Sequence, residues 1–180
     1  MQPQTSQPLF VRIADLVKGK LFGNAQPAAT TTPTTPPPVT YSARGQTFNP
    51  DDVAQLKKII FSEVSNRDVP KKTLEANVIF NTALNRMAAA NTAGQKRSLS
   101  QVLTQPNQYQ GYNSPLYQRY DNPGDSLTAA RKQQTDSIVD DMVKQVQGGN
   151  FKDNTNGAYY YKHVGDKIYY DDKKPLFANQ

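Results

Sequence analysis

The stretch KKIIFSEVSN, residues 57–66, ends the segment that decides how this chain folds. The segment starts at Asn49, a suitable N-cap, which Pro50 follows at the first helical position. Two aspartates come next, where the helix dipole favours negative charge. At about 100° per residue, one face collects the apolar side chains of Val53, Leu56, Ile59, Ile60 and Val64. We therefore predict an amphipathic helix over residues 49–66.

A carboxylate, Glu63, falls on that apolar face near the end of the predicted helix. One interpretation is structural: Glu63 closes the apolar face where the helix ends, or pairs with a nearby Arg or Lys. The other is chemical: a glutamate partly removed from water keeps its proton near neutral pH, the condition for a general acid that acts on a glycosidic oxygen. Helical position alone leaves both interpretations open.

The composition limits the class of protein. The chain has 180 residues, 36% of them hydrophobic, a formal net charge of +6 and no cysteine. The positive charge suggests an anionic partner, and nucleic acid, anionic lipid and the acidic bacterial cell wall all qualify. The lack of cysteine excludes disulfides and thiolate metal sites.

The first 48 residues differ from the rest. Residues 1–24 contain a short basic amphipathic segment, 8–22, which could dock on a partner protein, on the chain's own domain or on a membrane surface, and we favour the partner protein. Residues 25–48 contain AQPAATTTPTTPPPVT, whose prolines and threonines predict a semi-rigid linker. Arg12 and Asp15 interrupt the apolar run, so we expect neither a signal peptide nor a transmembrane helix.

Residues 49–180 read as one globular domain. After the first helix we predict helices over residues 71–90, within 98–105 and over 126–147. The last of these buries Ile138, Val139, Met142, Val143 and Val146. Residues 109–125 have no period and predict a long surface loop. Aromatic runs around Val164-Gly165-Asp166 predict a β-hairpin near residues 158–170. This order predicts an α+β, mainly helical domain with a small C-terminal hairpin.

Four segments in this order carry a resemblance to a known family. They are KIIFSEVSNR (58–67), TALNRMA (82–88), SLSQVLTQPNQYQGYN (98–113) and GNFKDNTNGAYYYKH (149–163). Together they resemble the bacterial spore-cortex-lytic and cell wall hydrolase family, over about residues 57–163. The resemblance implies a lysozyme-like or lytic-transglycosylase-like domain, with Glu63 as the catalytic glutamate.

The chain departs from the family pattern in three ways. Ser62 stands where the family often has glycine, and Arg67 stands where it has a second glutamate. The role of that second carboxylate is therefore absent or has moved to Asp68. The stretch between Glu63 and the LNR motif is also a few residues longer, which blurs the match at Glu75 and Ala76.

The resemblance implies cleavage of the β-1,4 bond between N-acetylmuramic acid and N-acetylglucosamine in peptidoglycan. Glu63 would protonate the glycosidic oxygen and then act as base. Its target as base would be either water, in a muramidase, or the muramyl C6 hydroxyl, in a lytic transglycosylase. A single carboxylate suffices if the substrate's own acetamido group stabilises the intermediate. The sequence leaves hydrolysis and transglycosylation open.

Other polar residues are candidates for substrate binding. Asn77, Asn81 and Asn85 recur every four residues and form either a solvated or interhelical face or a row of donors toward the sugar, with Asn85 the strongest candidate. Gln108 and Tyr109 either finish a turn or line the substrate groove.

Tyr159 and Tyr161 belong to an aromatic run that alternates across a predicted strand, so one packs inward or faces the cleft. Because His163 is the single histidine, we expect no metal site, and no motif indicates a cofactor.

The sequence thus predicts a peptidoglycan-cleaving enzyme, tethered in a phage virion or a bacterial envelope assembly. Virion or tail components would contact residues 8–40, and membrane contact of the N-terminal helix is less favoured. The alternative is a non-enzymatic structural component of such an assembly that keeps the hydrolase fold. A nucleic-acid partner is not favoured, because the basic residues are scattered and no recognition motif appears.

Overall fold

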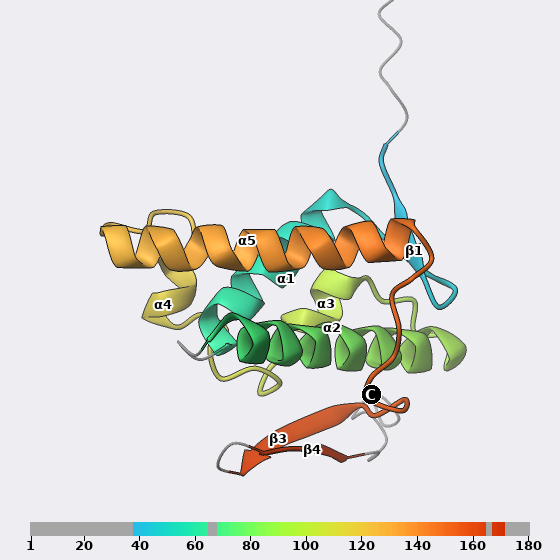
Figure 1. Ribbon diagram of the computed structural model, residues 1–180. Coiled ribbons are helices and arrows are strands. Elements are labelled where there is room, and N and C mark those ends of the chain that lie inside the picture. The colour runs from blue at the N-terminus through green and yellow to red at the C-terminus, as the bar shows by residue number, and fades with distance from the viewer. Residues whose placement is uncertain (1–37, 65–67, 165–166, 172–180) are drawn as a thin grey trace, which may run out of the picture. The chain divides into compact units, whose positions relative to one another are not determined.

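The computed structural model describes residues 38–64, 68–164 and 167–171 (Figure 1). These residues form a mixed α+β unit that is mostly helical, with small antiparallel strand pairs, as the sequence predicted at this coarse level. The predicted docking segment 1–24 and residues 25–37 of the predicted linker lie outside the described residues.

The first helix, α1 (Pro50–Glu63), forms as predicted, and its predicted apolar face is buried. A capping box starts it: the Asn49 side chain accepts from the Asp52 backbone N–H at 2.9 Å, and the Asp52 carboxylate accepts from the Asn49 N–H at 3.0 Å. The other Asp52 oxygen accepts from the backbone N–H and hydroxyl of Ser100 in α3 (Leu99–Leu103), at 2.8 and 2.6 Å. One buried carboxylate therefore fixes the start of α1 against α3.

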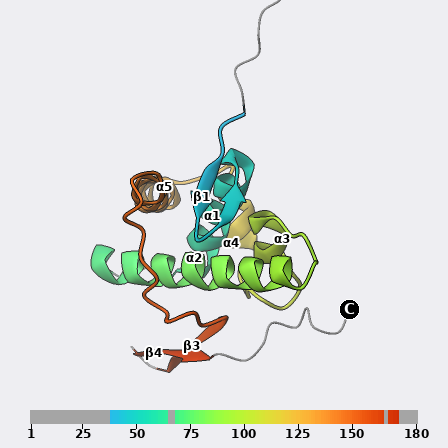
Figure 2. The same ribbon diagram turned by 90° about the vertical axis from the view of Figure 1, so that its right-hand side faces the viewer.

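Helix α2 (Val69–Thr92) is buried along most of its circumference, and α5 (Ser126–Gln147) has the bounds that the sequence predicted. The five apolar residues predicted for the buried side of α5 are all buried. Helix α1 packs against both of these helices. In both views, α2 lies between α5 and a β-hairpin (Figures 1 and 2).

That hairpin consists of β3 (Tyr160–Val164) and β4 (Lys167–Asp171). The strands are antiparallel and pair Tyr161 with Tyr170. The prediction of a C-terminal hairpin is confirmed, and the hairpin lies against α2.

A second hairpin was missed. Strands β1 (Tyr41–Ala43) and β2 (Gln46–Phe48) pair across Arg44 and Gly45, whose φ angles of 53° and 71° suit a tight two-residue turn. Phe48 is 2% exposed and packs edge-on to Phe80 of α2. The predicted boundary at residue 49 is therefore wrong: residues 41–48 belong to the folded domain, because their aromatic side chains join its core.

The predicted long surface loop, residues 109–125, is partly buried. It contains a one-turn helix, α4 (Pro115–Gln118), which the Ser114 hydroxyl caps. Tyr117 and Tyr120 are buried, and the Tyr117 hydroxyl and the Gln55 side chain of α1 are hydrogen-bonded at 2.8 Å. Tyr117 and Tyr120 thus anchor this part of the loop on α1.

Candidate functional site

Glu63 is the last residue of α1, and a cation from another helix fixes this helix end. The final carbonyls of a helix have no partner within it. Arg131 of α5 supplies one, since its guanidinium donates to the Phe61 oxygen at 2.7 and 3.0 Å and to the Val64 oxygen at 2.6 Å. Burial lowers the pKa of Arg131. The backbone on both sides of Glu63 is thus held in place.

The loop after α3 approaches Glu63 so closely that only glycine fits at one position. The Gly111 backbone N–H donates to Oε1 of Glu63. A Cβ at position 111 would lie 2.6 Å from the Ser62 hydroxyl oxygen and 2.9 Å from Oε1 of Glu63. Gly111 therefore lets a backbone donor reach the carboxyl group and orient it.

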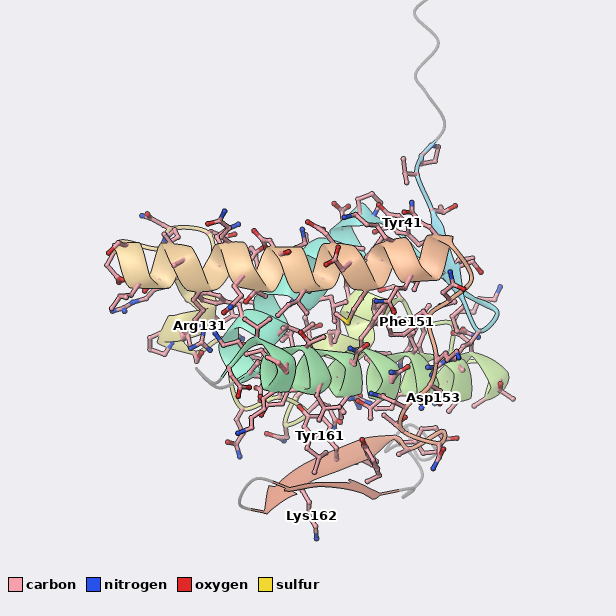
Figure 3. All side chains as sticks on the ribbon, viewed as in Figure 1. Tyr41, Arg131, Phe151, Asp153, Tyr161 and Lys162 are labelled. Carbon is pink, nitrogen blue, oxygen red and sulfur yellow. The ribbon has the colours of Figure 1, made fainter. Side chains whose placement is uncertain are left out.

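Glu63 faces a pocket of about 430 Å³. Its walls come from the end of α1, one face of α2, residues 108–110 of the loop and residues 159–162 at the start of the C-terminal hairpin. Five residues that the sequence singled out meet there: Glu63, Gln108, Tyr109, Tyr159 and Tyr161. Figure 3 shows Tyr161 projecting from β3 toward α2, while Lys162 projects to the other side of the strand.

Asn85, the remaining candidate, is placed elsewhere. It is not among the described residues that line the pocket. Its side-chain oxygen accepts from Arg44 at 2.7 Å, and its amide nitrogen donates to the Ala158 oxygen at 2.9 Å and to the Thr155 hydroxyl at 3.2 Å. The amide thus ties α2 to the β1–β2 turn and to the segment before β3. These contacts give Asn85 a structural role, and its role in substrate binding stays a prediction.

The neighbouring amide, Asn81, belongs to the same network. It accepts from Arg44 and donates to the Asn154 side chain at 2.8 Å. Asp153 completes it with an ion pair to Arg44 at 3.3 Å (Figure 3 labels Asp153). The described contacts of Asn81 and Asn85 are thus structural, and they join α2 to the β1–β2 turn and to the segment before β3.

A second carboxylate in the pocket was missed. Glu75, in the second turn of α2, is 5% exposed and lines the same pocket as Glu63. One signal could have found it: the chain contains just two glutamates, and these are the two. Asp68, the other position considered for a second carboxylate, caps α2 by accepting from the Lys71 backbone N–H at 3.1 Å.

Two phenols, those of Tyr109 and Tyr161, line the pocket together with the two glutamates and Arg86. Burial raises the pKa of Tyr161 well above its ordinary value, and Tyr109, Glu63 and Glu75 raise it further, against a lowering by Arg86. Burial likewise raises the pKa of Tyr109. Both phenols therefore keep their protons and can act as hydrogen-bond donors.

Two polar atoms of the pocket residues have no hydrogen-bond partner among the described residues. They are the hydroxyl of Tyr109 and Nε of Arg86, whose side chains are 6% and 2% exposed. Burial raises the pKa of the Tyr109 hydroxyl, and Arg86 and Thr82 lie near enough to lower it. Because buried polar groups are normally paired, such atoms suit a site that a polar ligand completes.

No group of three or more His, Asp or Glu side chains that could hold a metal ion occurs among the described residues. In the same part of the chain, no helix has the length and apolar character needed to cross a membrane. The chemistry available in the pocket is thus that of two carboxyl groups, buried phenols, side-chain amides and one guanidinium.

No family model, curated protein or solved structure matches this chain.

Proposed function

We propose that this protein cleaves the glycan strands of peptidoglycan at the β-1,4 bond between N-acetylmuramic acid and N-acetylglucosamine, with Glu63 as the general acid. The observation that carries the proposal is the position of Glu63: a glutamate on the apolar face of α1 lines a pocket that Tyr109 and Tyr161 also line. We also propose that the helical domain is lysozyme-like or transglycosylase-like, in line with the four segments that resemble the cell wall hydrolase family.

The local electrostatics suit an acid. Glu63 stands at the C-terminal end of α1, where the helix dipole is negative and disfavours a charged carboxylate. The Gly111 N–H donates to Oε1 and so orients the carboxyl group that would carry the proton to the glycosidic bond. The lining residues fit a sugar, since tyrosine rings offer an apolar plate with a polar edge and Gln108 offers both a donor and an acceptor to an acetamido group.

We further propose that residues 8–40 tether the enzyme to protein components of a phage virion or a bacterial envelope assembly. This part of the proposal rests on the sequence: a basic amphipathic segment followed by a stretch rich in proline and threonine. No cofactor is needed for the reaction.

The test compares wild type with Glu63→Gln on purified peptidoglycan, with released fragments identified by mass spectrometry. Glutamine keeps the size of the side chain but cannot donate the proton, so the rate should fall about 10²–10⁴-fold while the protein stays folded. Asp141→Asn is the matched control, because Asp141 is an exposed carboxylate of α5, paired with Lys144 at 3.1 Å. It should cleave like wild type.

Two results would contradict the proposal. If wild type releases no glycan fragments from peptidoglycan of any tested chemotype, the non-enzymatic structural alternative replaces it. If Glu63→Gln cleaves as fast as Asp141→Asn, Glu63 is not the acid.

A further inference from the structure

Both glutamates of the 180-residue chain line one pocket. They come from different helices, Glu63 from the end of α1 and Glu75 from the second turn of α2. None of the described aspartates lines this pocket. Two carboxyl groups facing one cavity are the arrangement in which many glycosidases divide the roles of acid and base.

Glu75 is buried, with 5% of the residue exposed, and it lines the pocket. Along the same face of α2, at intervals of three and four residues, come Ile79, Thr82 and Arg86, and all three line the pocket. Glu75 therefore belongs to a stripe of α2 that faces the cavity rather than the solvent.

We propose that Glu75 is the second catalytic carboxylate of this site and activates the water that attacks the sugar, so that the reaction is hydrolysis rather than transglycosylation. This inference rests on the proposed function and goes beyond it, because Glu63 alone would serve either reaction.

The step balances as follows. The C1–O bond of the muramyl residue breaks, and the leaving oxygen takes the proton of Glu63. The oxygen of water forms the new bond to C1, and its proton passes to Glu75. The products are a reducing-end muramic acid and a free hydroxyl on the leaving sugar, which together contain one added water.

The first measurement uses wild type and needs no variant. Digestion in ¹⁸O-labelled water should give reducing ends that carry one ¹⁸O. Fragments one water lighter than these, which contain a 1,6-anhydro ring, would overturn the assignment of Glu75 while leaving glycan cleavage by Glu63 intact.

The second measurement identifies the group that activates the water. Glu75→Ala should lose about 10²–10⁴-fold in rate. Sodium azide should restore much of the loss and yield a glycosyl azide, because azide attacks C1 without giving up a proton and the space left by Glu75 admits it. Glu63→Gln should not respond to azide, since its leaving oxygen still lacks a proton.

The outcomes separate the two claims. If wild type hydrolyses and Glu75→Ala is as fast as Asp141→Asn, Glu75 has no catalytic role and the proposed function stands. A Glu75→Ala protein that folds, is slow and does not respond to azide also overturns the assignment, because its loss is then structural.

If Glu75→Ala does not fold, Glu75→Gln takes its place and should be slow, and the wild-type products still decide. If wild type cleaves nothing, the proposed function fails, and with it this inference.

Discussion

Two polar stripes of α2 meet different surroundings. Asn81 and Asn85 point into a network with Arg44, Asp153 and the segment before β3. On an adjoining face of the helix, Glu75, Ile79, Thr82 and Arg86 line the pocket. The stripe that looked more suited to bind a sugar is structural, and the less regular one faces the candidate site.

The contacts explain the difference. An amide side chain donates and accepts at once, so it can satisfy a backbone carbonyl and a guanidinium together, as Asn85 does with Ala158 and Arg44. A carboxylate cannot satisfy a carbonyl. In the pocket stripe, one terminal nitrogen of Arg86 donates to the Val102 carbonyl at 2.9 Å, and its Nε has no described partner. In α2, the regularly spaced asparagines make tertiary contacts. The stripe that mixes polar and apolar residues and contains a buried glutamate lines the pocket.

Substitutions in the two stripes of α2 should have different effects: one should slow glycan cleavage and the other should destabilise the fold. We expect Glu75→Gln to lower the rate of glycan cleavage by about 10²–10⁴-fold with little change in unfolding free energy. Asn85→Ala should lower the unfolding free energy by about 2–3 kcal/mol, because it leaves buried partners unpaired. Its cleavage rate per folded molecule should match wild type. Urea unfolding and initial rates measure both, and an Asn85→Ala protein that is stable but inactive would reverse the roles of the stripes.

The next largest effect is expected at Gly111, where the loop meets α1. Gly111→Ala places a Cβ 2.6 Å from the Ser62 hydroxyl oxygen, so the loop must move away from Glu63. Overpacking of this kind costs about 1–3 kcal/mol. We expect a lower unfolding temperature and slower cleavage together. Gly148→Ala, at the end of α5 and outside the pocket, is the control, and equal rates for the two variants would show that the Gly111 contact does not orient Glu63.

Two truncations test whether β1 and Arg44 support the network around Asn81 and Asn85. Deletion of residues 1–37 should leave the unfolding temperature unchanged. Deletion of residues 1–45 removes β1 and Arg44, the residue that contacts both Asn81 and Asn85. It should lower the free energy of unfolding by about 1–2 kcal/mol. Identical melting curves for the two truncations would mean that β1 contributes nothing to the domain.

The smallest effect concerns Asp153 and its pH dependence. Burial alone would raise the pKa of Asp153, but hydrogen bonds from Thr155 and Gly157 and the charge of Arg44 together lower it below the ordinary 3.8. The ionised carboxylate therefore stabilises the fold at neutral pH, and this contribution is lost as the pH falls through the lowered pKa.

Asp153→Asn should accordingly cost about 1 kcal/mol at pH 7, and the difference from wild type should shrink as the pH falls below 3.8 and through the lowered pKa of Asp153. Urea unfolding over a series of pH values measures it. A difference that stays constant with pH would show that the charge of Asp153 is not what stabilises this network.

Much of the fold could be predicted because its helices carry local signals. The capping residues Asn49 and Asp125 and the apolar periodicity of α1 and α5 act over a few residues, and these elements form where expected. The β1–β2 hairpin was missed because its strands have three residues each and its turn is Arg-Gly, which lacks the usual Asn-Gly or Asp-Gly signal.

The site was predicted in part for a similar reason. Glu63 stands out because it interrupts an otherwise apolar face of α1. Glu75 does not stand out, because α2 is buried on most sides and its sequence marks no single face as inward. Which stripe of α2 meets the cavity depends on how the C-terminal hairpin lies against it, and that is a long-range contact with no local signal.

Both glutamates line one pocket, and the ¹³C chemical shifts of their side-chain carboxyl carbons test whether this pocket binds a glycan. Wild type labelled with ¹³C at the glutamate carboxyl carbon gives two signals, which Glu63→Gln and Glu75→Gln assign. Addition of a peptidoglycan glycan fragment, in conditions where cleavage is slow, should shift both signals, while a pentapeptide lacking sugar should shift neither. If saturating glycan leaves both signals in place, the pocket between α1, α2 and β3 does not bind this substrate and the proposed function is wrong.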